Sequence, residues 1–219
     1  MSVAIENFVK AIYKNNINDV KNTKPGNIAK LLGISSAAAT DMAKNLASKD
    51  LLNYEKYKAL ELTKAGETLA LNVIRKHRLW EAFLHRTFDM SLHEIHREAE
   101  LLEHETSDFL ANKISDFLGN PKFDPHGDPI PNVNGKITTV DTSISLSNTQ
   151  EGKLYIISRL MSDEKEFFDF CAINGLKYGN KVFVTKQFSK NKMTQISMNN
   201  NTILLNEDFT KIIYVNESS

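Results

Sequence analysis

Hydrophobic residues recur at intervals of three and four positions through most of the chain before residue 119, a period typical of amphipathic helices. Residues 4–14 open this pattern with an apolar face made of Ile5, Phe8, Val9 and Ile12. Beyond residue 152 the pattern changes to short β-rich runs, which are KLYIISRL, NKVFVTKQF, MTQISM, TILLN and KIIYV. One helix, at about 163–174, interrupts these runs. The sequence therefore predicts a mainly α protein with a small β-barrel at its C-terminal end.

Two short helices are expected after the opening segment. Thr23 is positioned to cap a helix over 27–32, which ends at Gly33. One of the two serines that follow caps a second helix over 37–49. Two helices joined by a tight turn that contains glycine form the outline of a helix-turn-helix.

A hairpin and two long helices come next in the pattern. Residues 51–63 read as two short strands around a polar tip, which is the form of a wing. Thr63 then caps a helix that reaches about Phe88. Ser91 and the glutamate three positions later form a capping box, and this box starts a helix that ends before Gly119.

Four of the five prolines fall in the segment NPKFDPHGDPIP, at 120–131, which excludes a helix there. A polar stretch with few large apolar residues follows at 132–152, and we interpret it as a linker. The predicted divisions are therefore residues 1–62, residues 63–131, the linker, and residues 153–219.

Composition narrows the class of protein. The 219 residues suffice for one large domain or two small ones, and the 41% hydrophobic and 25% charged content is typical of soluble globular proteins. No apolar run approaches the roughly 18 residues of a membrane-spanning helix, and the N-terminal segment lacks the apolar stretch of a signal peptide. Cys171 is the single cysteine, which excludes an intramolecular disulfide and a cysteine-based zinc finger. A cytoplasmic location is expected.

The net charge of zero conceals an uneven distribution. Residues 1–76 hold 12 Lys and Arg against 7 Asp and Glu, a net charge of +5. Residues 77–130 hold 5 against 11, a net charge of −6, and they contain all six histidines. A basic segment beside an acidic, histidine-rich one indicates two kinds of partner, a polyanion and a cation.

The second helix of the helix-turn-helix outline carries small and hydroxyl side chains in its first turns. Such side chains let a helix approach base edges in the major groove, while nearby lysines neutralise phosphates. The candidate DNA contacts are Ser35, Ser36, Ala37, Ala38, Thr40, Asp41 and Lys44, with Lys24, Lys30, Lys56 and Lys58 on phosphates. The alternative is a three-helix packing unit with a solvated lysine face.

Histidines and carboxylates share helix faces in the acidic segment. His77 and Glu81 are four positions apart and lie on one face. On the next predicted helix a single stripe is formed by His96, Glu100, Glu103 and His104. Nitrogen and oxygen ligands without sulfur suit Mn²⁺, Fe²⁺, Co²⁺ or Zn²⁺. For each pair taken alone, a surface ion pair is the simpler interpretation.

Asp124 and His126 stand in the proline-rich segment, where the stiffened chain holds both polar groups in place. They are candidate ligands for the same metal ion or for a second one. Ordinary turn residues are the alternative.

The order of these features resembles one family. A helix-turn-helix and a wing precede the strings RKHRLWEAFL at 75–84, HREAELLEHETSD at 96–108 and PHGDPIP at 125–131. The chain is similar over about residues 3–131 to the iron- and manganese-dependent repressors, typified by the diphtheria toxin repressor and the manganese transport regulator. The resemblance implies a winged helix-turn-helix at 1–62, a metal-binding and dimerisation domain at 63–131, and an SH3-like domain at 153–219. It also implies a homodimer that binds palindromic operators once loaded with divalent metal.

The resemblance assigns ligands by position. One implied site consists of His77, Glu81 and His96. The helical part of the neighbouring primary site consists of Glu100, Glu103 and His104. The carboxylate of Glu100 stands where iron-type members tend to have cysteine, which favours Mn²⁺ over Fe²⁺, although Zn²⁺ or Co²⁺ is expected to bind in vitro. A second metal is implied at Asp124 and His126 with Glu81 and an acidic residue of the C-terminal domain, for which the candidates are Asp163 and, as an alternative, Glu166.

The first helix departs from the family pattern. It normally donates a ligand at the position of Asn7, and some manganese-type members add a glutamate at the position of Lys10. An amide oxygen is a weaker ligand, and a charged lysine cannot coordinate a metal. This departure motivates an alternative, a family member that binds DNA independently of metal.

A helical metalloenzyme is the third hypothesis. The chain contains no H-E-x-x-H string, and Glu100 stands where the inverted form H-x-x-E-H requires histidine. The sequence therefore predicts a metal-dependent repressor rather than an enzyme.

Overall fold

The computed structural model describes residues 1–18, 23–199 and 201–218. The chain divides into two compact units that do not follow its linear order. Unit 1 consists of Met1–His77, Leu101–Asn112 and Pro131–Thr138, and unit 2 consists of Arg78–Glu100, Lys113–Ile130 and Thr139–Ser219. The division passes through three helices, so each unit is described by itself.

Unit 1 begins with three helices, which are α1 (Val3–Asn18), α2 (Pro25–Leu31) and α3 (Ser36–Ser48). The Ser35 side chain caps α3 by accepting a hydrogen bond from the Ala38 N–H at 3.1 Å, as predicted. The expected cap of α2 is wrong. Lys24 is its N-cap residue and makes no side-chain cap hydrogen bond, whereas Thr23 is fully buried beside it. Pro25 lacks an N–H, which lowers the need for a capping side chain.

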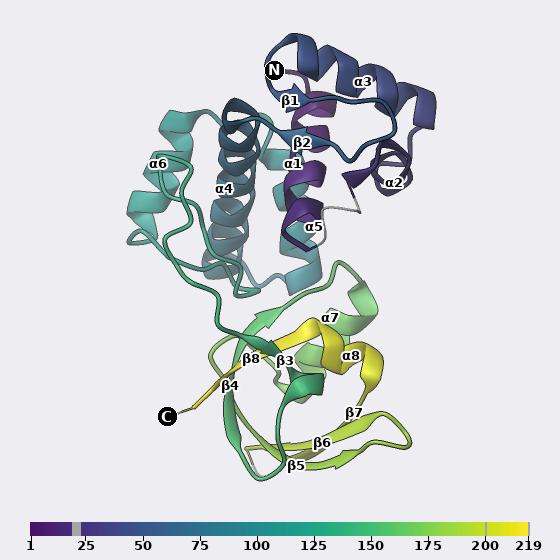
Figure 1. The fold of residues 1–219 in the computed structure, drawn as a ribbon. Helices are drawn as coiled ribbons and strands as arrows, with labels where there is room; N and C mark the ends of the chain where they lie inside the picture. The colour runs from purple at the N-terminus through teal and green to yellow at the C-terminus, as the bar shows by residue number, and fades with distance from the viewer. Residues whose placement is uncertain (19–22, 200, 219) are drawn as a thin grey trace. The chain divides into compact units, whose positions relative to one another are not determined.

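The predicted wing is an antiparallel hairpin of two short strands, β1 (Leu52–Asn53) and β2 (Glu61–Leu62). Figure 1 shows the hairpin beside α1, α2 and α3, and α1 packs against both α2 and β2. These elements share one apolar core, whose fully buried members include Phe8, Ile12, Ile28, Leu46 and Leu60. The winged helix-turn-helix outline of the sequence is therefore present.

Helix α4 (Lys64–Thr87) starts where predicted, since the Thr63 hydroxyl oxygen accepts the Gly66 N–H at 3.2 Å. Helix α5 (Leu92–Leu102) begins with the predicted capping box. The Glu94 carboxylate accepts the Ser91 N–H at 2.8 Å, and the Ser91 hydroxyl accepts the Glu94 N–H at 3.3 Å.

The single helix expected from Ser91 to Gly119 is wrong. Helix α5 ends at Leu102, and a separate helix, α6 (Asp108–Phe117), follows. The Thr106 hydroxyl donates to the Leu102 carbonyl at 2.6 Å, and the Ser107 hydroxyl accepts the Leu110 N–H at 3.2 Å. A threonine that closes one helix and a serine that caps the next stabilise the break better than continuous helix does.

Unit 2 contains a six-stranded antiparallel sheet in the order β3-β8-β4-β5-β6-β7. Its strands are β3 (Ile144–Ser145), β4 (Leu154–Leu160), β5 (Lys181–Phe188), β6 (Met193–Met198), β7 (Asn201–Asn206) and β8 (Ile213–Glu217). The five predicted runs form β4 to β8. Strand β3, the short helix η2 (Leu146–Asn148) and helix α8 (Glu207–Ile212) were not predicted from the sequence.

Helix α7 (Lys165–Asn174) lies between β4 and β5 and ends at Gly175, as expected. One side of the sheet packs with α7 into a core that contains Tyr155, Phe167 and Cys171. Burial raises the pKa of the Cys171 thiol to about 12, so this group is inert at neutral pH. In the part of the chain that the structure describes, no helix is both long and apolar enough to span a membrane.

The proline-rich segment runs as turns along β4. The Leu160 N–H donates to the His126 carbonyl at 2.8 Å. Gly127 has a φ of +89°, and a Cβ there would lie 2.0 Å from the Ser158 carbonyl oxygen. A glycine is therefore required where the segment touches the strand.

We expect Gly127→Ala to lower the free energy of unfolding by about 2 kcal/mol or more, because it adds a backbone clash to an unfavourable φ. Gly152→Ala is the matched control, since Gly152 has a φ of +77° but open space around its Cβ position. Urea unfolding of both variants measures the difference. Equal losses of stability would show that the contact with Ser158 has no effect.

Candidate metal centre and DNA-binding surface

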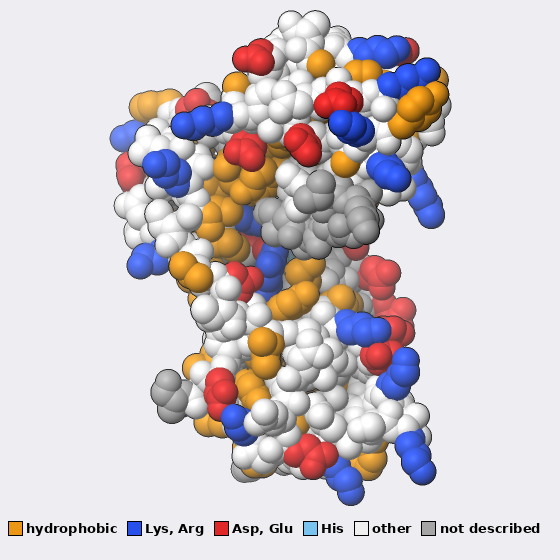
Figure 2. Space-filling model, in the orientation of Figure 1, with side chains coloured by type: hydrophobic (Ala, Val, Ile, Leu, Met, Phe, Trp, Pro, Cys, Tyr) orange, Lys and Arg blue, Asp and Glu red, His pale blue; other side chains and the backbone are white. Residues whose placement is uncertain are grey.

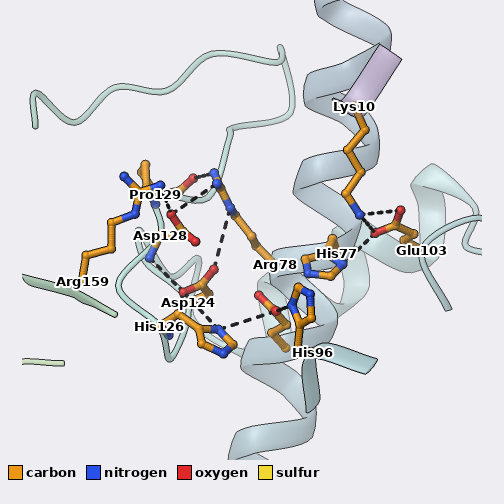
Figure 3. A network of polar contacts seen from close by, with 11 residues as sticks. Lys10, His77, Arg78, His96, Glu103, Asp124, His126, Asp128, Pro129 and Arg159 are labelled. Atoms are coloured by element: carbon orange, nitrogen blue, oxygen red, sulfur yellow. Dashed lines mark hydrogen bonds and ion pairs between the residues drawn. The ribbon is translucent and has the colours of Figure 1, made fainter. Parts of the chain in front are cut away.

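The Glu103 carboxylate is the centre of a buried polar cluster in unit 1, here called the Glu103 cluster and made of Glu6, Lys10, His77, Glu103 and His104. Glu103 is 1% exposed. Its oxygens accept hydrogen bonds from the Lys10 ammonium at 2.8 and 2.7 Å. Nδ1 of His77 lies 2.7 Å from one oxygen, and Nε2 of His104 lies 3.2 Å from the other. Figure 3 shows Lys10, His77 and Glu103 converging in this way.

The break between α5 and α6 is what places Glu103 and His104. Both residues follow the last residue of α5, so the predicted single helical stripe with His96 and Glu100 is wrong at its C-terminal end. Leaving the helix lets Glu103 meet side chains from α1 and α4 at once. Sequence reasoning found both residues from their spacing, but not the turn that positions them.

Glu6 orients the His104 imidazole. Its carboxylate lies 2.6 Å from Nδ1 of His104, while Nε2 of the same ring lies 3.2 Å from Glu103. A carboxylate that holds the far nitrogen of a histidine is the usual outer partner of a metal ligand. Sequence reasoning missed Glu6, whose spacing from Lys10 on α1 is that of an ordinary surface ion pair.

We expect Glu6→Gln to weaken Mn²⁺ binding by about tenfold, because a neutral amide holds the His104 ring less firmly than a carboxylate does. The measurement is a competition titration against a chelator of known affinity. Glu67→Gln, at an exposed acidic position in the first turn of α4, is the control. An unchanged affinity in Glu6→Gln would exclude an orienting role.

Asn7 stands next to this cluster in the sequence of α1. Its Oδ1 atom is buried and meets no hydrogen-bond partner among the described residues. A buried amide oxygen without a partner carries an energetic cost, and a metal ion is one group that removes it. Asn7 therefore keeps the donor atom that the sequence predicted, while Lys10 is a partner of Glu103 and not a ligand.

A second polar cluster lies in unit 2, here called the Glu81 cluster and made of Glu81, His96, Asp124 and His126. Nδ1 of His96 lies 2.8 Å from Oε1 of Glu81, and Nδ1 of His126 lies 3.6 Å from the same oxygen. Glu81, Asp124 and His126 are all buried, and each offers a ligand atom within 4.8 Å of the others. The prediction that the proline-rich segment brings its two polar residues to the carboxylate of α4 therefore agrees with the structure.

The Asp124 side chain has two roles in this cluster. Its Oδ1 accepts the N–H groups of His126 and Asp128 at 2.8 and 2.9 Å, which shapes the turn. Its Oδ2 is buried and has no hydrogen-bond partner among the described residues. The same is true of Nε2 of His126. The two atoms are a carboxylate oxygen and an imidazole nitrogen, both of which bind Mn²⁺ or Fe²⁺.

Burial and neighbouring charge shift the pKa values of this cluster. Burial, together with the nearby carboxylates of Glu81 and Asp128, raises the pKa of Asp124 well above its usual range. Burial alone would lower the pKa of His126, but the carboxylates of Glu81, Asp124 and Asp128 outweigh it and raise the pKa to about 9. Shifted pKa values that have burial and a specific charged neighbour as their causes are common at functional sites.

Two arginines border the Glu81 cluster and were missed from the sequence. Arg78 donates to the Pro129 carbonyl at 2.5 Å and lies 3.8 Å from Oδ2 of Asp124. Arg159, on β4, pairs with Asp128 at 2.5 Å. The RKHRL string contains Arg78, but only the fold shows that its guanidinium supports the proline-rich turn (Figure 3).

The other predicted ligands have these positions. Glu100 is half-buried near the end of α5. His77 belongs to unit 1, whereas Glu81 and His96 belong to unit 2. A metal site formed by these three residues therefore stays a prediction. Asp163 and Glu166 are exposed at the start of α7, and their role also stays a prediction. The buried side chain of α7 that meets the His126 ring is Phe168, with ring centres 5.1 Å apart.

The candidate DNA contacts lie on the surface of unit 1. Ser35, Ser36, Ala37, Ala38, Asp41 and Lys44 are exposed on α3 or at its start, whereas Thr40 is half-buried. Lys24 before α2 and Lys56 at the tip of the wing are also exposed. Figure 2 shows Lys and Arg side chains projecting over this part of the unit, with acidic groups between them. Tyr57, 84% exposed at the wing tip beside Lys56, was missed from the sequence.

Comparison with known proteins agrees with this geometry. Residues 1–60 match the iron dependent repressor N-terminal DNA binding domain, and residues 63–132 match the iron dependent repressor metal binding and dimerisation domain. The HTH-type transcriptional regulator MntR of Geobacillus kaustophilus is 30% identical over 100 residues, which cover 46% of this chain and 70% of that protein.

Two solved structures are similar over nearly the whole chain. A manganese-dependent transcriptional repressor in complex with manganese has a TM-score of 0.90 at 27% identity and covers 97% of this chain and 99% of that one. The structure of ScaR with bound Cd²⁺ has a TM-score of 0.81 at 30% identity and covers 98% and 99%. The chain therefore belongs to the iron-dependent repressor family, whose members are metal-dependent transcriptional repressors with DNA-binding and metal-binding domains.

Proposed function

We propose that this protein is a homodimeric repressor that binds a palindromic operator when loaded with divalent metal, and so controls metal uptake or storage. Mn²⁺ is the favoured metal and Fe²⁺ the alternative, while Zn²⁺ and Co²⁺ are expected to bind in vitro. The observation that carries the proposal is the convergence on Glu103 of side chains from α1, α4 and the turn after α5. This convergence joins the first helix of the DNA-binding segment to the metal-binding segment.

The proposed primary site contains Glu100, Glu103 and His104, with Asn7 as the ligand from α1. Carboxylate and amide oxygens suit Mn²⁺, and no sulfur ligand is included in the set. The buried Oδ1 atom of Asn7 supports the assignment, since it has no hydrogen-bond partner among the described residues. When bound, the ion would supply a shared positive charge between these groups.

A neighbouring site is proposed at His77, Glu81 and His96, and a further set at Glu81, Asp124 and His126 with Asp163. The buried Oδ2 of Asp124 and Nε2 of His126 support the second set, because both atoms meet no hydrogen-bond partner among the described residues. Glu81 belongs to both sets, so the protein would hold its metals in adjacent sites that share this carboxylate.

For DNA, helix α3 is proposed to enter the major groove while the wing tip and its lysines contact phosphates. A two-fold dimer places two such helices on successive turns of the duplex, and for this reason the operator is proposed to be palindromic. The matched dimerisation domain supports the dimer. The C-terminal sheet is proposed to belong to an SH3-like domain, although its edge strands β3 and β7 do not pair with each other among the described residues and the predicted barrel is not closed there. The proposed location is the cytoplasm, where the protein would meet its DNA.

Metal is proposed to act by a population shift. It stabilises the arrangement of α1 that binds DNA, and its effect equals the difference in its affinity for the DNA-competent and other states. A role as a helical metalloenzyme is less well supported, because it does not explain why the chain contains a winged helix-turn-helix. A member that binds DNA without metal is the second candidate, and the Lys10–Glu103 ion pair is the observation that favours it.

Footprinting tests the dimer and operator together. With Mn²⁺, we expect protection of two half-sites about one helical turn apart in DNA upstream of the gene for this chain. With a chelator, protection requires a much higher protein concentration. Protection of a single half-site, or no protection with any metal, would contradict the proposal.

A further inference from the structure

The Lys10 side chain is buried in the Glu103 cluster. Lys10 is 5% exposed, and its ammonium donates to both oxygens of a carboxylate that is itself 1% exposed. Lysine is rarely buried unless it is paired, because an ammonium loses strong hydration on leaving water. Here one cation takes both oxygens of Glu103, and these are the oxygens that the proposed primary metal site requires.

The Lys10 ammonium occupies the position next to Glu103 that a bound cation would take. The other members of the Glu103 cluster are the Glu6 carboxylate and the imidazoles of His77 and His104, both of which also contact Glu103. A divalent ion bound by the Glu103 carboxylate would lie close to the ammonium that donates to both of its oxygens, and two cations side by side in a buried site repel strongly.

Lys10 also makes the connection that the metal is proposed to make. It lies on α1, and Glu103 lies in the turn after α5, so their ion pair fastens the first helix of the DNA-binding segment to the metal-binding segment. A buried, doubly hydrogen-bonded pair of this kind holds its partners far more firmly than a surface pair does.

We propose that Lys10 is a built-in cation of the primary metal centre, which holds Glu103 in the metal-free protein and competes with the metal ion for it. The inference rests on the proposed function and adds its regulation. Lys10 gives the metal-free protein part of the DNA affinity that metal confers, and it lowers metal affinity because the ion must displace an ammonium. The difference in DNA affinity between the metal-free and the metal-loaded protein is therefore smaller than it would be without Lys10.

Lys10→Met tests the proposal, since methionine fills a similar volume without charge. We expect it to raise Mn²⁺ affinity about tenfold or more, measured by chelator competition in the absence of DNA. In the presence of chelator, we expect its operator affinity to fall by a similar factor. Lys14→Met, one turn along α1 at an exposed position, is the matched control and leaves Mn²⁺ affinity unchanged.

A variant that does not fold would give no titration, so a second variant is included. Lys10→Gln keeps a hydrogen-bond donor for Glu103, and we expect Mn²⁺ to raise its Tm by more than it raises that of the wild type. Equal Mn²⁺ affinity in wild type, Lys10→Met and Lys10→Gln would overturn the inference. Failure of the proposed function has a different result, since the wild-type protein would then bind no operator with any metal.

Discussion

Replacement of Glu103 by alanine is expected to lower the operator affinity of the Mn²⁺-treated protein by about 100-fold or more. Glu103 is the carboxylate on which α1, α4 and the turn after α5 converge, so its loss removes a proposed metal ligand and the connection to the DNA-binding segment. Fluorescence anisotropy with labelled operator DNA measures the change. Glu105→Ala, an exposed position in the same turn, is the control and keeps full affinity.

The same substitution should also destabilise the protein without metal. It leaves the Lys10 ammonium buried without its carboxylate, and removal of one partner of a buried ion pair costs about 3–5 kcal/mol. Glu103→Gln separates the two effects, because it keeps hydrogen-bond acceptance for Lys10 but is a poor metal ligand. If Mn²⁺ raises the operator affinity of Glu103→Gln as much as that of the wild type, the Glu103 carboxylate contributes to stability but not to the metal response.

The Asp124→Asn variant is expected to lose one equivalent of bound Mn²⁺ while retaining its fold. An amide keeps the Oδ1 acceptor that shapes the turn with the N–H groups of His126 and Asp128. The amide is neutral, and burial and the Glu81 carboxylate already raise the pKa of Asp124 well above its usual range, so the exchange removes a charge that its surroundings disfavour. The free energy of unfolding without metal is therefore expected to change by less than about 1 kcal/mol.

Equilibrium dialysis followed by metal analysis measures the bound Mn²⁺ in this variant. Asp116→Asn, at an exposed position on α6, is the control and retains the wild-type stoichiometry. If Asp124→Asn binds as much Mn²⁺ as the wild type, the Glu81 cluster is not a metal site.

Local signals in the sequence were enough to predict much of the fold. The capping residues Ser35, Thr63 and Ser91 placed the starts of α3, α4 and α5, because a cap is decided by residues close in the chain. The break between α5 and α6 was missed although Thr106 and Ser107 mark it, since the apolar period continues through them.

The candidate sites were predicted as sets of residues but not as arrangements. The spacing of Glu103 and His104 marked them as candidate ligands, yet their partners Glu6 and Lys10 lie more than ninety positions away in the chain. A pairing over such a distance depends on how α1 packs, which no local pattern encodes. The sequence marked Lys10 only as a residue that cannot bind metal at a family ligand position, and its burial against Glu103 is seen only in the structure.

The most direct test of the central claim is an operator titration of the wild-type protein, with Mn²⁺ and with chelator, at one fixed salt concentration. The account predicts that Mn²⁺ raises affinity for DNA upstream of the gene by about tenfold or more, and that the rise disappears in Glu103→Ala. Equal affinity with and without Mn²⁺ in the wild type would contradict metal control and leave a repressor that binds DNA constitutively.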